Sequence, residues 1–514
     1  MQRNRLKRLT YQHTVMGAVF GWLLYLVNFS GSVAMFVDEI RVWEEPAARR
    51  TINSSVPMQT VIDAFISDLR APLDFIEVTL PSPGSSYYEL RARYGTGDDL
   101  KNETRRYAID TGVPVSGRGG EGVALWLQQL HRYLAIEPKI IGRTLVGLTG
   151  VYMLVLILSG IVTHQKIARD LFKIRWTRSL HVKWRDLHNA TGLWTLPFAI
   201  VIAFSGIMVG TPPLMAVVAG LPMTGGDISR LEAMLGRSEE PSRSGVNLSM
   251  VSADHAMKEV AAATDFVPAG VRIQRYGDRN AAYWVLADSP REMLYLSNVP
   301  VNAATGAVEM ERYAPLTEGI PESVAGRVFA ASTPLHYGLF GPLALNVLYY
   351  LLGMAVSVCI AVGMLIYFER RLGGSTGHFS QRTYKRLSLV NAGLVAGLPM
   401  VTLLMFYLDR ILMSAGESRY VVLAISFVAL WFSCVIYALI CRIARVVARR
   451  LMGLTLLLAI FLPAFDYLTL GRGVANEAVL LIHGLAVFSG LCLLVYLAVT
   501  RAVFTAKGTE PMLG

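Results

Sequence analysis

The sequence is poor in charge. Only 17% of its 514 residues are Asp, Glu, Lys or Arg, whereas 53% are hydrophobic. Several runs of about twenty residues carry no charge, and an α-helix needs about that length to cross the roughly 30 Å hydrocarbon core of a bilayer. A water-soluble core cannot bury so many apolar runs. The composition therefore excludes a soluble protein and indicates a polytopic membrane protein.

Cysteine is scarce as well. No Cys-x-x-Cys pair is present, so no thiolate site for zinc or an iron–sulfur cluster can be recognised. The long polar segments contain no cysteine, which excludes a disulfide in them. The four cysteines all lie within or at the ends of apolar runs, at Cys359, Cys434, Cys441 and Cys492.

Common catalytic motifs are missing too. The sequence has no P-loop and no Gly-x-Ser-x-Gly elbow. The stretch GRGGEG (117–122) matches Gly-x-Gly-x-x-Gly only formally, because no buried apolar strand precedes it and no acidic residue follows at the expected distance. Since no flavin or nicotinamide site can be recognised, a redox reaction would take its electrons from a separate donor.

What is present is a series of long apolar runs, from which we expect eight transmembrane helices. The first run continues into FVDEIRVWEEP and lacks a small-residue cleavage site, so it is not a cleaved signal peptide. The runs cover residues 14–37, 144–164, 190–212, 343–368, 388–408, 419–441, 451–470 and 478–500.

Basic residues indicate the orientation of these helices. The net charge of +11 comes from Lys and Arg clusters at 3–8, 165–185, 369–386 and 441–450, which lie at alternate ends of successive runs. The positive-inside rule then predicts that both termini are cytoplasmic. The basic excess is a topology signal and does not indicate nucleic-acid binding.

The two long outward segments resemble small α+β domains. The first has helical periodicity at 55–69 and strand patterns at 74–80, 87–94 and 105–110. The second has a helical pattern at 251–263, strand patterns at 269–277, 281–288 and 292–297, and a strand–turn–strand pattern at 299–312.

The expected organisation has six parts. They are 1–37 (cytoplasmic N-terminus and first span), 38–143 (first periplasmic α+β domain), 144–212 (second span, basic cytoplasmic loop and third span), 213–342 (second periplasmic α+β domain), 343–372 (fourth span and its cytoplasmic end) and 388–500 (four further spans).

The first four spans read as a tandem repeat. QHTVMGAVFGWLLYLVNFSG (12–31) and LHNATGLWTLPFAIVIAFSG (187–206) each place His second, Gly sixth and Ser-Gly last. LHRYLAIEPKIIGRTLVGL (130–148) and LHYGLFGPLALNVLYYLLG (335–353) each place Leu-His just ahead of a span. The repeat predicts a four-helix bundle whose site lies between facing helices.

Five histidines lie at the ends of these four spans. His13, His164 and His188 are on the cytoplasmic side, and His131 and His336 are on the outer side. A single such histidine is usually an interfacial residue that reaches toward water, but five at matched levels favour a shared role. His483, inside the last span, has no role that the sequence reveals.

Each cytoplasmic histidine has a glycine one helical turn deeper in the membrane, and residues four apart share a helix face. A missing side chain beside an imidazole leaves room for a flat, bulky group, although these glycines can also serve plain helix packing. The glycines are Gly17 for His13, Gly160 for His164 and Gly192 for His188.

Imidazoles that face each other from different helices can hold haem iron between two axial nitrogens, whereas zinc needs three or four converging ligands. Two levels of histidine predict two haems that carry electrons across the bilayer. We expect His131 and His336 to bind the outer haem. For the cytoplasmic haem, the repeat favours His13 and His188 as ligands. His164 is the alternative ligand, because its span ends at the same predicted level in the membrane. The histidine left over would hydrogen-bond a propionate or pass protons and electrons from the donor.

Several stretches resemble the PepSY-associated transmembrane family, the iron-regulated inner-membrane proteins of bacteria. The resemblance covers residues 5–372 and is carried by His-x-x-x-Gly, by Asp-Leu-His-Asn (186–189) and by the stretches around the four spans. It implies haem b, periplasmic PepSY-like domains and reduction of siderophore-bound iron(III) at the periplasmic face. The four C-terminal spans lie beyond the family's usual core.

The expected function is that of an inner-membrane di-haem ferric-siderophore reductase that releases Fe(II). Its expected partners are a ferric siderophore, the lipid bilayer and an unidentified cytoplasmic or quinol electron donor; no catalytic side chain can be assigned. One alternative is a non-catalytic, membrane-anchored PepSY module that binds periplasmic peptides or regulates a partner. A haem or siderophore permease is less favoured, because the sequence indicates no inverted repeat or broken helix.

Overall fold

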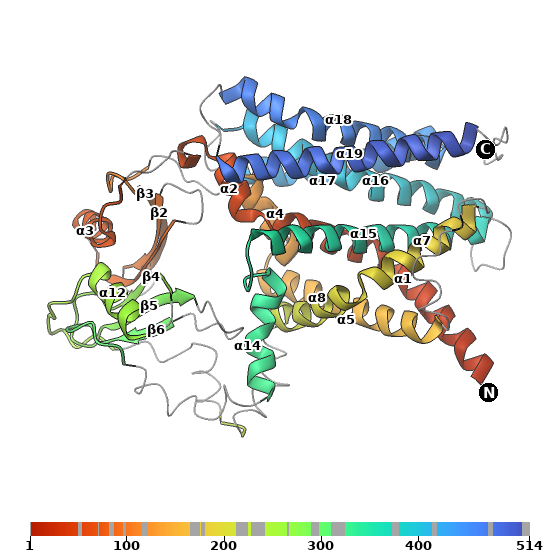
Figure 1. The fold of residues 1–514 in the computed structure, drawn as a ribbon. Coiled ribbons are helices and arrows are strands. Elements are labelled where there is room, and N and C mark those ends of the chain that lie inside the picture. The colour runs from red at the N-terminus through yellow and green to blue at the C-terminus, as the bar shows by residue number, and fades with distance from the viewer. Residues whose placement is uncertain are drawn as a thin grey trace. The chain divides into compact units, whose positions relative to one another are not determined.

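The chain folds into two compact units, and each is described by itself. The membrane unit comprises Met1–Glu44, Gly120–Gly210 and Gly341–Gly514, and the sheet unit comprises Glu45–Gly119 and Thr211–Phe340. Figure 1 labels their elements along the chain. The computed structural model describes residues 2–49, 54–69, 71–81, 87–95, 99–115, 122–164, 175, 180–211, 225–227, 242–264, 267–288, 298–309, 324–372, 380–413, 419–470 and 476–505.

The sheet unit contains an antiparallel sheet of six strands in the order β3-β2-β1-β4-β5-β6. Two helices, α3 (Met58–Asp68) and α12 (Ala253–Ala263), share one apolar core with it. The strands are β1 (Leu73–Thr79), β2 (Tyr87–Tyr94), β3 (Lys101–Ala108), β4 (Val267–Gln274), β5 (Ala282–Asp288) and β6 (Asn298–Val301).

The two predicted α+β domains therefore form a single unit, which corrects the expected organisation. Each half supplies one helix and three strands, and β1 pairs with β4 so that Ile76 lies opposite Ile273 and Val78 opposite Val271. A separate half would leave one of these strands as an open edge, whereas pairing satisfies the backbone of both. The predicted strand at 292–297 lies outside the described residues.

The two halves cap each other's helices. The Asp254 carboxylate accepts hydrogen bonds from the backbone N–H groups of Met58 and Gln59 at 2.9 and 3.0 Å. In return, the Gln59 side-chain oxygen accepts from the N–H of Ala253 at 2.9 Å. Pro57, which precedes α3, provides no side-chain cap of its own. The start of α3 therefore depends on a residue of the other half.

Replacing Asp254 by Ala should loosen α3, because two N-terminal N–H groups lose their acceptor. A lost cap costs about 1 kcal/mol, so amide exchange in residues 58–68 should accelerate about fivefold. Hydrogen-exchange mass spectrometry of the full chain measures this. Glu259→Ala is the control, because it removes a carboxylate that is 43% exposed from the same helix as Asp254. Equal exchange of α3 in the Asp254→Ala and unsubstituted proteins would contradict the cap.

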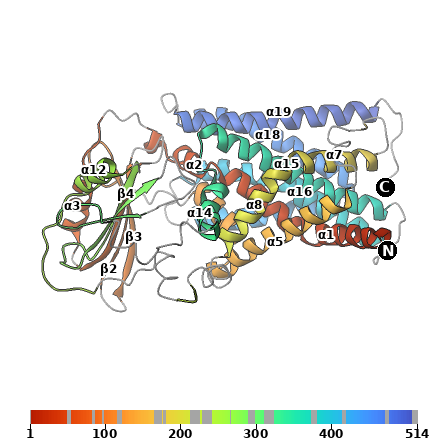
Figure 2. The ribbon, with the colours of Figure 1, turned by 60° about the horizontal axis from the view of Figure 1, so that its bottom comes forward.

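The membrane unit agrees with the expected number of spans. Among the described residues, seven helices are long and apolar enough to cross a membrane, and a bent pair makes up to eight. Figures 1 and 2 show that α1 begins and α19 ends at the same end of this unit. The seven helices belong to α1 (Gln2–Ala34), α5 (Lys139–Thr163), α15 (Leu343–Leu372), α16 (Gln381–Ile411), α17 (Arg419–Cys441), α18 (Ala444–Leu470) and α19 (Glu477–Thr505).

The third predicted span is broken, which corrects the expectation that no helix is. It consists of α7 (Leu180–Trp194) and α8 (Leu196–Gly210), which meet at 67°. Pro197 has no N–H to continue the helical ladder, and this accounts for the break. Trp22 occupies the matching place in the first repeat, where α1 is continuous. The absence of a broken helix is therefore no longer an argument against a permease. A transporter built from inverted repeats would have a matching break in the other repeat, however, and α1 has none.

Short helices that the sequence analysis did not predict precede two of the spans. They are α4 (Val123–Tyr133), which precedes α5, and α14 (Val324–Tyr337), which precedes α15. Each Leu-His pair lies in the last turn of such a helix, so His131 and His336 occupy equivalent places in the two repeats.

Close backbone contacts join the first spans into the predicted bundle. α1 packs against α5 and α15, α5 packs against α8, and α7 packs against α15. A Cβ on Gly210 would lie 2.6 Å from the Cα of Gly147, so only glycine permits this approach of α8 to α5. The Asn28 side chain of α1 donates to the Gly353 carbonyl and to Ser357 of α15, both at 2.7 Å.

Candidate haem-binding site

Three of the five predicted ligand histidines share one hydrogen-bond pattern. In each, Nδ1 lies within hydrogen-bond distance of a backbone carbonyl on a neighbouring helix. His13 of α1 meets Leu156 of α5 at 3.1 Å, and His188 of α7 meets Cys359 of α15 at 2.9 Å. His131 of α4 meets Val27 of α1 at 3.0 Å.

This pattern assigns the tautomer of the three rings. A carbonyl oxygen only accepts hydrogen bonds, so Nδ1 carries the proton and donates it. Nδ1 of His13 also lies 3.0 Å from the Ser159 hydroxyl, which donates its own proton to the Leu156 carbonyl at 3.0 Å and therefore accepts from the ring. In the neutral ring the lone pair then belongs to Nε2. Histidines that bind metals are held in this way, since a bond from the second nitrogen fixes the ring and raises its basicity as a ligand.

Each of the three rings also lies with its Cε1 edge against a glycine of a neighbouring helix. A Cβ would lie 3.4 Å from Cε1 of His13 if placed on Gly160, and 3.1 Å from Cε1 of His188 if placed on Gly363. On Gly31 it would lie only 2.5 Å from Cε1 of His131, a distance that real contacts do not reach. The glycines thus make room for the imidazoles themselves.

This placement differs from the one that the sequence indicated. Gly160 is four residues from His164 on α5, but it faces His13 of α1. A Cβ on Gly17 would meet Leu156 of α5 at 3.9 Å, and one on Gly192 would meet Sγ of Cys359 at 3.4 Å. Gly17, Gly160 and Gly192 therefore lie at contacts with a neighbouring helix, in addition to being one turn from the histidine of their own helix.

His13 and His188 lie close together at the predicted cytoplasmic end. Their ring centroids are 6.3 Å apart and the ring planes meet at 71°. A metal–imidazole bond of about 2 Å and a ring whose centre lies about 1 Å from its nitrogens place the centres of two axial rings about 6 Å apart. Axial rings can adopt any mutual angle about the metal–nitrogen axis. The separation fits two axial ligands of one iron.

His164 ends α5, where its backbone N–H bonds the Gly160 carbonyl at 3.0 Å. Its Nδ1 is buried and has no hydrogen-bond partner in the described part of the chain. A buried ring nitrogen without a partner is costly. The nitrogen would be satisfied by a group such as the propionate that we predicted for the third histidine.

His131 lies partly buried where α4 packs against α1. Burial lowers the pKa of His131 to about 4, against the opposing effect of its bond to Val27. The ring is therefore neutral at pH 7 and keeps the lone pair that a metal needs. His336 belongs to the sheet unit, where it lies in the last turn of α14 next to Tyr337, with ring centroids 5.5 Å apart. The shared outer haem of His131 and His336 stays a prediction.

The sequence analysis missed two neighbours of His188, Gly363 and Cys359. Sγ of Cys359 lies 3.4 Å from Nδ1 of His188, next to the carbonyl that accepts the Nδ1 proton. Both residues lie on α15, far from His188 in the sequence, so no local motif could have identified them.

Comparison with known proteins agrees with this architecture. The sequence matches the PepSY-associated TM region over residues 10–370. It is also 28% identical over 294 residues to an uncharacterized protein of Pseudomonas aeruginosa, covering 54% of this chain and 71% of that protein. The chain carries the family's region across its first four spans and the sheet unit between them, and it belongs to the PepSY-associated transmembrane family.

Proposed function

We propose that this protein is a di-haem reductase that carries electrons across the bacterial inner membrane to a periplasmic ferric siderophore and releases Fe(II). The observation that supports this most is the pair His13 and His188, whose ring centroids are 6.3 Å apart and whose Nδ1 atoms both bond carbonyls. A haem bound there would supply one-electron chemistry.

The protein's own residues hold and orient the two imidazoles that would bind the iron. Nδ1 of His13 bonds the Leu156 carbonyl and the Ser159 hydroxyl, and Nδ1 of His188 bonds the Cys359 carbonyl, so Nε2 is the atom with which each ring would bind iron. Gly160 and Gly363 allow the rings to sit against helices α5 and α15. The rings therefore need little rearrangement to bind, which lowers the free-energy cost of ligation.

A second haem at His131 would complete a path through the membrane. His131 bonds Val27, which lies on the same helix as His13, roughly 21 Å further along at about 1.5 Å per residue. This separation is smaller than the roughly 30 Å thickness of the hydrocarbon core, so one haem can lie near each face of the bilayer. The repeated Leu-His position makes His336 our candidate for the other axial ligand.

The reaction is one-electron reduction of the substrate's iron, from Fe(III) to Fe(II), with the electron supplied by a quinol or a cytoplasmic reductase. Siderophores bind iron through hard oxygen ligands, whose hold weakens on the softer Fe(II). The positive-inside distribution of Lys and Arg places both termini in the cytoplasm and the sheet unit in the periplasm under this proposal.

Three single substitutions should identify the axial ligands of the haem at the predicted cytoplasmic end. His13→Ala and His188→Ala should each reduce the haem content from about two to one per protein, because one iron loses an axial nitrogen. His164→Ala should keep both haems and accept electrons more slowly. Pyridine haemochrome assay of the purified variants measures this. Two low-spin haems in His13→Ala would make His164 the ligand instead.

Gly31→Ala should remove the haem at the other end. Alanine favours helices over glycine by about 1 kcal/mol, so a loss cannot come from helix propensity and must come from the Cβ that displaces His131. Haem content should fall from about two to one per protein, and the His13–His188 haem should keep its spectrum. Gly484→Ala is the matched control, since a Cβ there meets nothing within 4 Å. Two unchanged haems in Gly31→Ala would contradict the assignment of His131.

The reductase activity itself can be tested with pre-reduced protein. A ferric siderophore should reoxidise the haems and yield Fe(II), which a ferrous chelator detects in equal amount. The gallium complex of the same siderophore should compete for binding without oxidising the haems, because gallium(III) is not reduced under these conditions. Failure of every ferric chelate tried to oxidise the reduced protein would end the reductase proposal.

A further inference from the structure

The first turn of α4 is held by two buried carboxylates from other helices. The N–H of Val123 donates to Oδ1 of Asp409 on α16 at 3.1 Å. The N–H of Ala124 donates to Oε2 of Glu44 at 2.9 Å, where Glu44 ends α2 (Val37–Glu44). A carboxylate at a helix N-terminus satisfies unpaired N–H groups and complements the helix dipole. Helix α4 thus begins on an anchor that its own sequence does not supply.

Asp409 is fixed in turn by α17. The Arg419 guanidinium spans both carboxylate oxygens, with Nε at 2.7 Å from Oδ1 and NH2 bonded to Oδ2. The Asp409 side chain is fully buried, and that of Arg419 is 10% exposed. Such a two-pronged ion pair has one geometry. The position of the carboxylate that anchors α4 is therefore set by α16 and α17.

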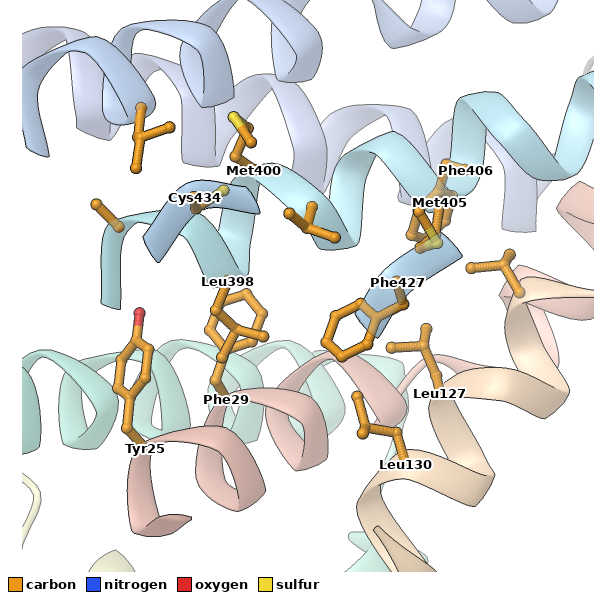
Figure 3. Close-up of a cluster of buried hydrophobic side chains, with 14 of the residues drawn as sticks. Tyr25, Phe29, Leu127, Leu130, Leu398, Met400, Met405, Phe406, Phe427 and Cys434 are labelled. Atoms are coloured by element: carbon orange, nitrogen blue, oxygen red, sulfur yellow. The ribbon is translucent and has the colours of Figure 1, made fainter. Parts of the chain in front are cut away.

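An apolar contact between the same elements runs alongside this anchor. Figure 3 shows Leu127 and Leu130 of α4 toward Phe427 of α17, and Phe29 of α1 beside Leu398 of α16. Trp126 of α4 packs on Phe427 with ring centroids 4.6 Å apart. Trp126 and Leu127 are fully buried. Part of the buried face of α4 therefore packs against helices beyond the family region, and the rest packs against α1, α2 and α5.

The C-terminal module (α16–α19) also contacts α2, the helix that supplies the Glu44 carboxylate to α4. Arg410 of α16 donates to the Trp43 carbonyl at 2.8 Å and pairs with Asp466 of α18 at 2.5 Å. The Trp43 indole N–H donates to Nε2 of His483 on α19 at 3.2 Å. All four C-terminal helices thus contribute to one buried polar layer that anchors α2 and α4.

From these contacts we propose that the C-terminal module clamps α4 and that Asp409 is a positioning residue for His131. His131 lies about two turns along α4 from Val123. Its ring has little freedom, because it fits a slot that only Gly31 leaves open and bonds the Val27 carbonyl. A shift at the start of α4 would therefore displace the imidazole. The clamp rests on contacts in the protein alone, and only its effect on a haem rests on the proposed function.

Two isosteric substitutions separate the clamp from general stability. Asp409→Asn leaves one amide oxygen in place of two carboxylate oxygens, so Val123 or Arg419 loses an acceptor and Arg419 loses its counter-charge. Asp74→Asn is the control, because it also removes a buried carboxylate from arginine partners, but those partners are Arg93 and Arg275 of the sheet unit and not members of the polar layer around α2 and α4. Hydrogen exchange in residues 123–133 should accelerate about tenfold or more in Asp409→Asn. In Asp74→Asn it should stay within about twofold of the unsubstituted protein, the scatter expected of substitutions that share no partners with α4.

Redox titration followed by haem absorption then tests the link to His131. In Asp409→Asn the haem at His131 should be lost or shift in reduction potential, while the His13–His188 haem keeps its potential. Faster exchange of α4 with both haems unchanged would overturn the positioning role. Unchanged exchange of α4 would overturn the clamp. If the protein binds no haem, the proposed function fails, and the exchange experiment still decides the clamp.

If Asp409→Asn does not accumulate in the membrane, a charge-free variant replaces it. Asp409→Leu with Arg419→Met removes both members of the ion pair, so no buried charge is left without a partner. It still leaves the Val123 N–H without its acceptor. The same acceleration of exchange in residues 123–133 is expected, and normal exchange there would overturn the clamp.

Discussion

The contact between an imidazole and a glycine of the adjacent helix is the constraint on which the membrane unit depends. It occurs between α1 and α5, between α7 and α15, and between α4 and α1, each time with Nδ1 bonded to a carbonyl of the partner helix. Imidazoles away from water need a hydrogen-bond partner, and each of these rings reaches a helical carbonyl beside a glycine. A Cβ on Gly31 or Gly363 would crowd the ring, and one on Gly160 would just touch it. The positions of the helices and of the histidines are thus set together.

The sheet unit shows the same dependence of one repeat on the other. Neither half caps its own helix fully. Asp254 of the second half accepts from the Gln59 N–H at the start of α3, and the Gln59 side chain of the first half accepts from the Ala253 N–H at the start of α12. The central strands β1 and β4 pair with each other, so neither half could be removed without exposing an edge. The internal repeat seen in the sequence is therefore a repeat of parts that fold as one unit.

The features that sequence predicts here are those with a local signature. Long apolar runs predict the spans, the periodicity at 55–69 and 251–263 predicts α3 and α12, and the spacing of His13 and His188 in two matching stretches predicts that they meet. What it does not predict is which neighbouring helix a given residue faces. Gly160 is close to His164 in sequence, but the helix packing turns it toward His13.

Other differences have equally physical causes. The break at Pro197 was visible as a residue, but the apolar run continues through it, so hydropathy alone gave one span. The union of the two halves into one sheet depends on pairing between β1 and β4, whose strand patterns would be the same in two separate domains. The buried charges Asp409, Arg410 and Asp466 lie near helix ends, where sequence analysis treats charge as solvated.

The central claim is that imidazoles of this protein hold haem iron on both axial sides. The absorption spectrum of the purified protein, oxidised and then reduced with dithionite, tests it most directly. The account predicts a sharp Soret band and narrow α and β bands of low-spin haem b in the reduced state, at about two haems per protein. A colourless protein purified from haem-replete cells would contradict it.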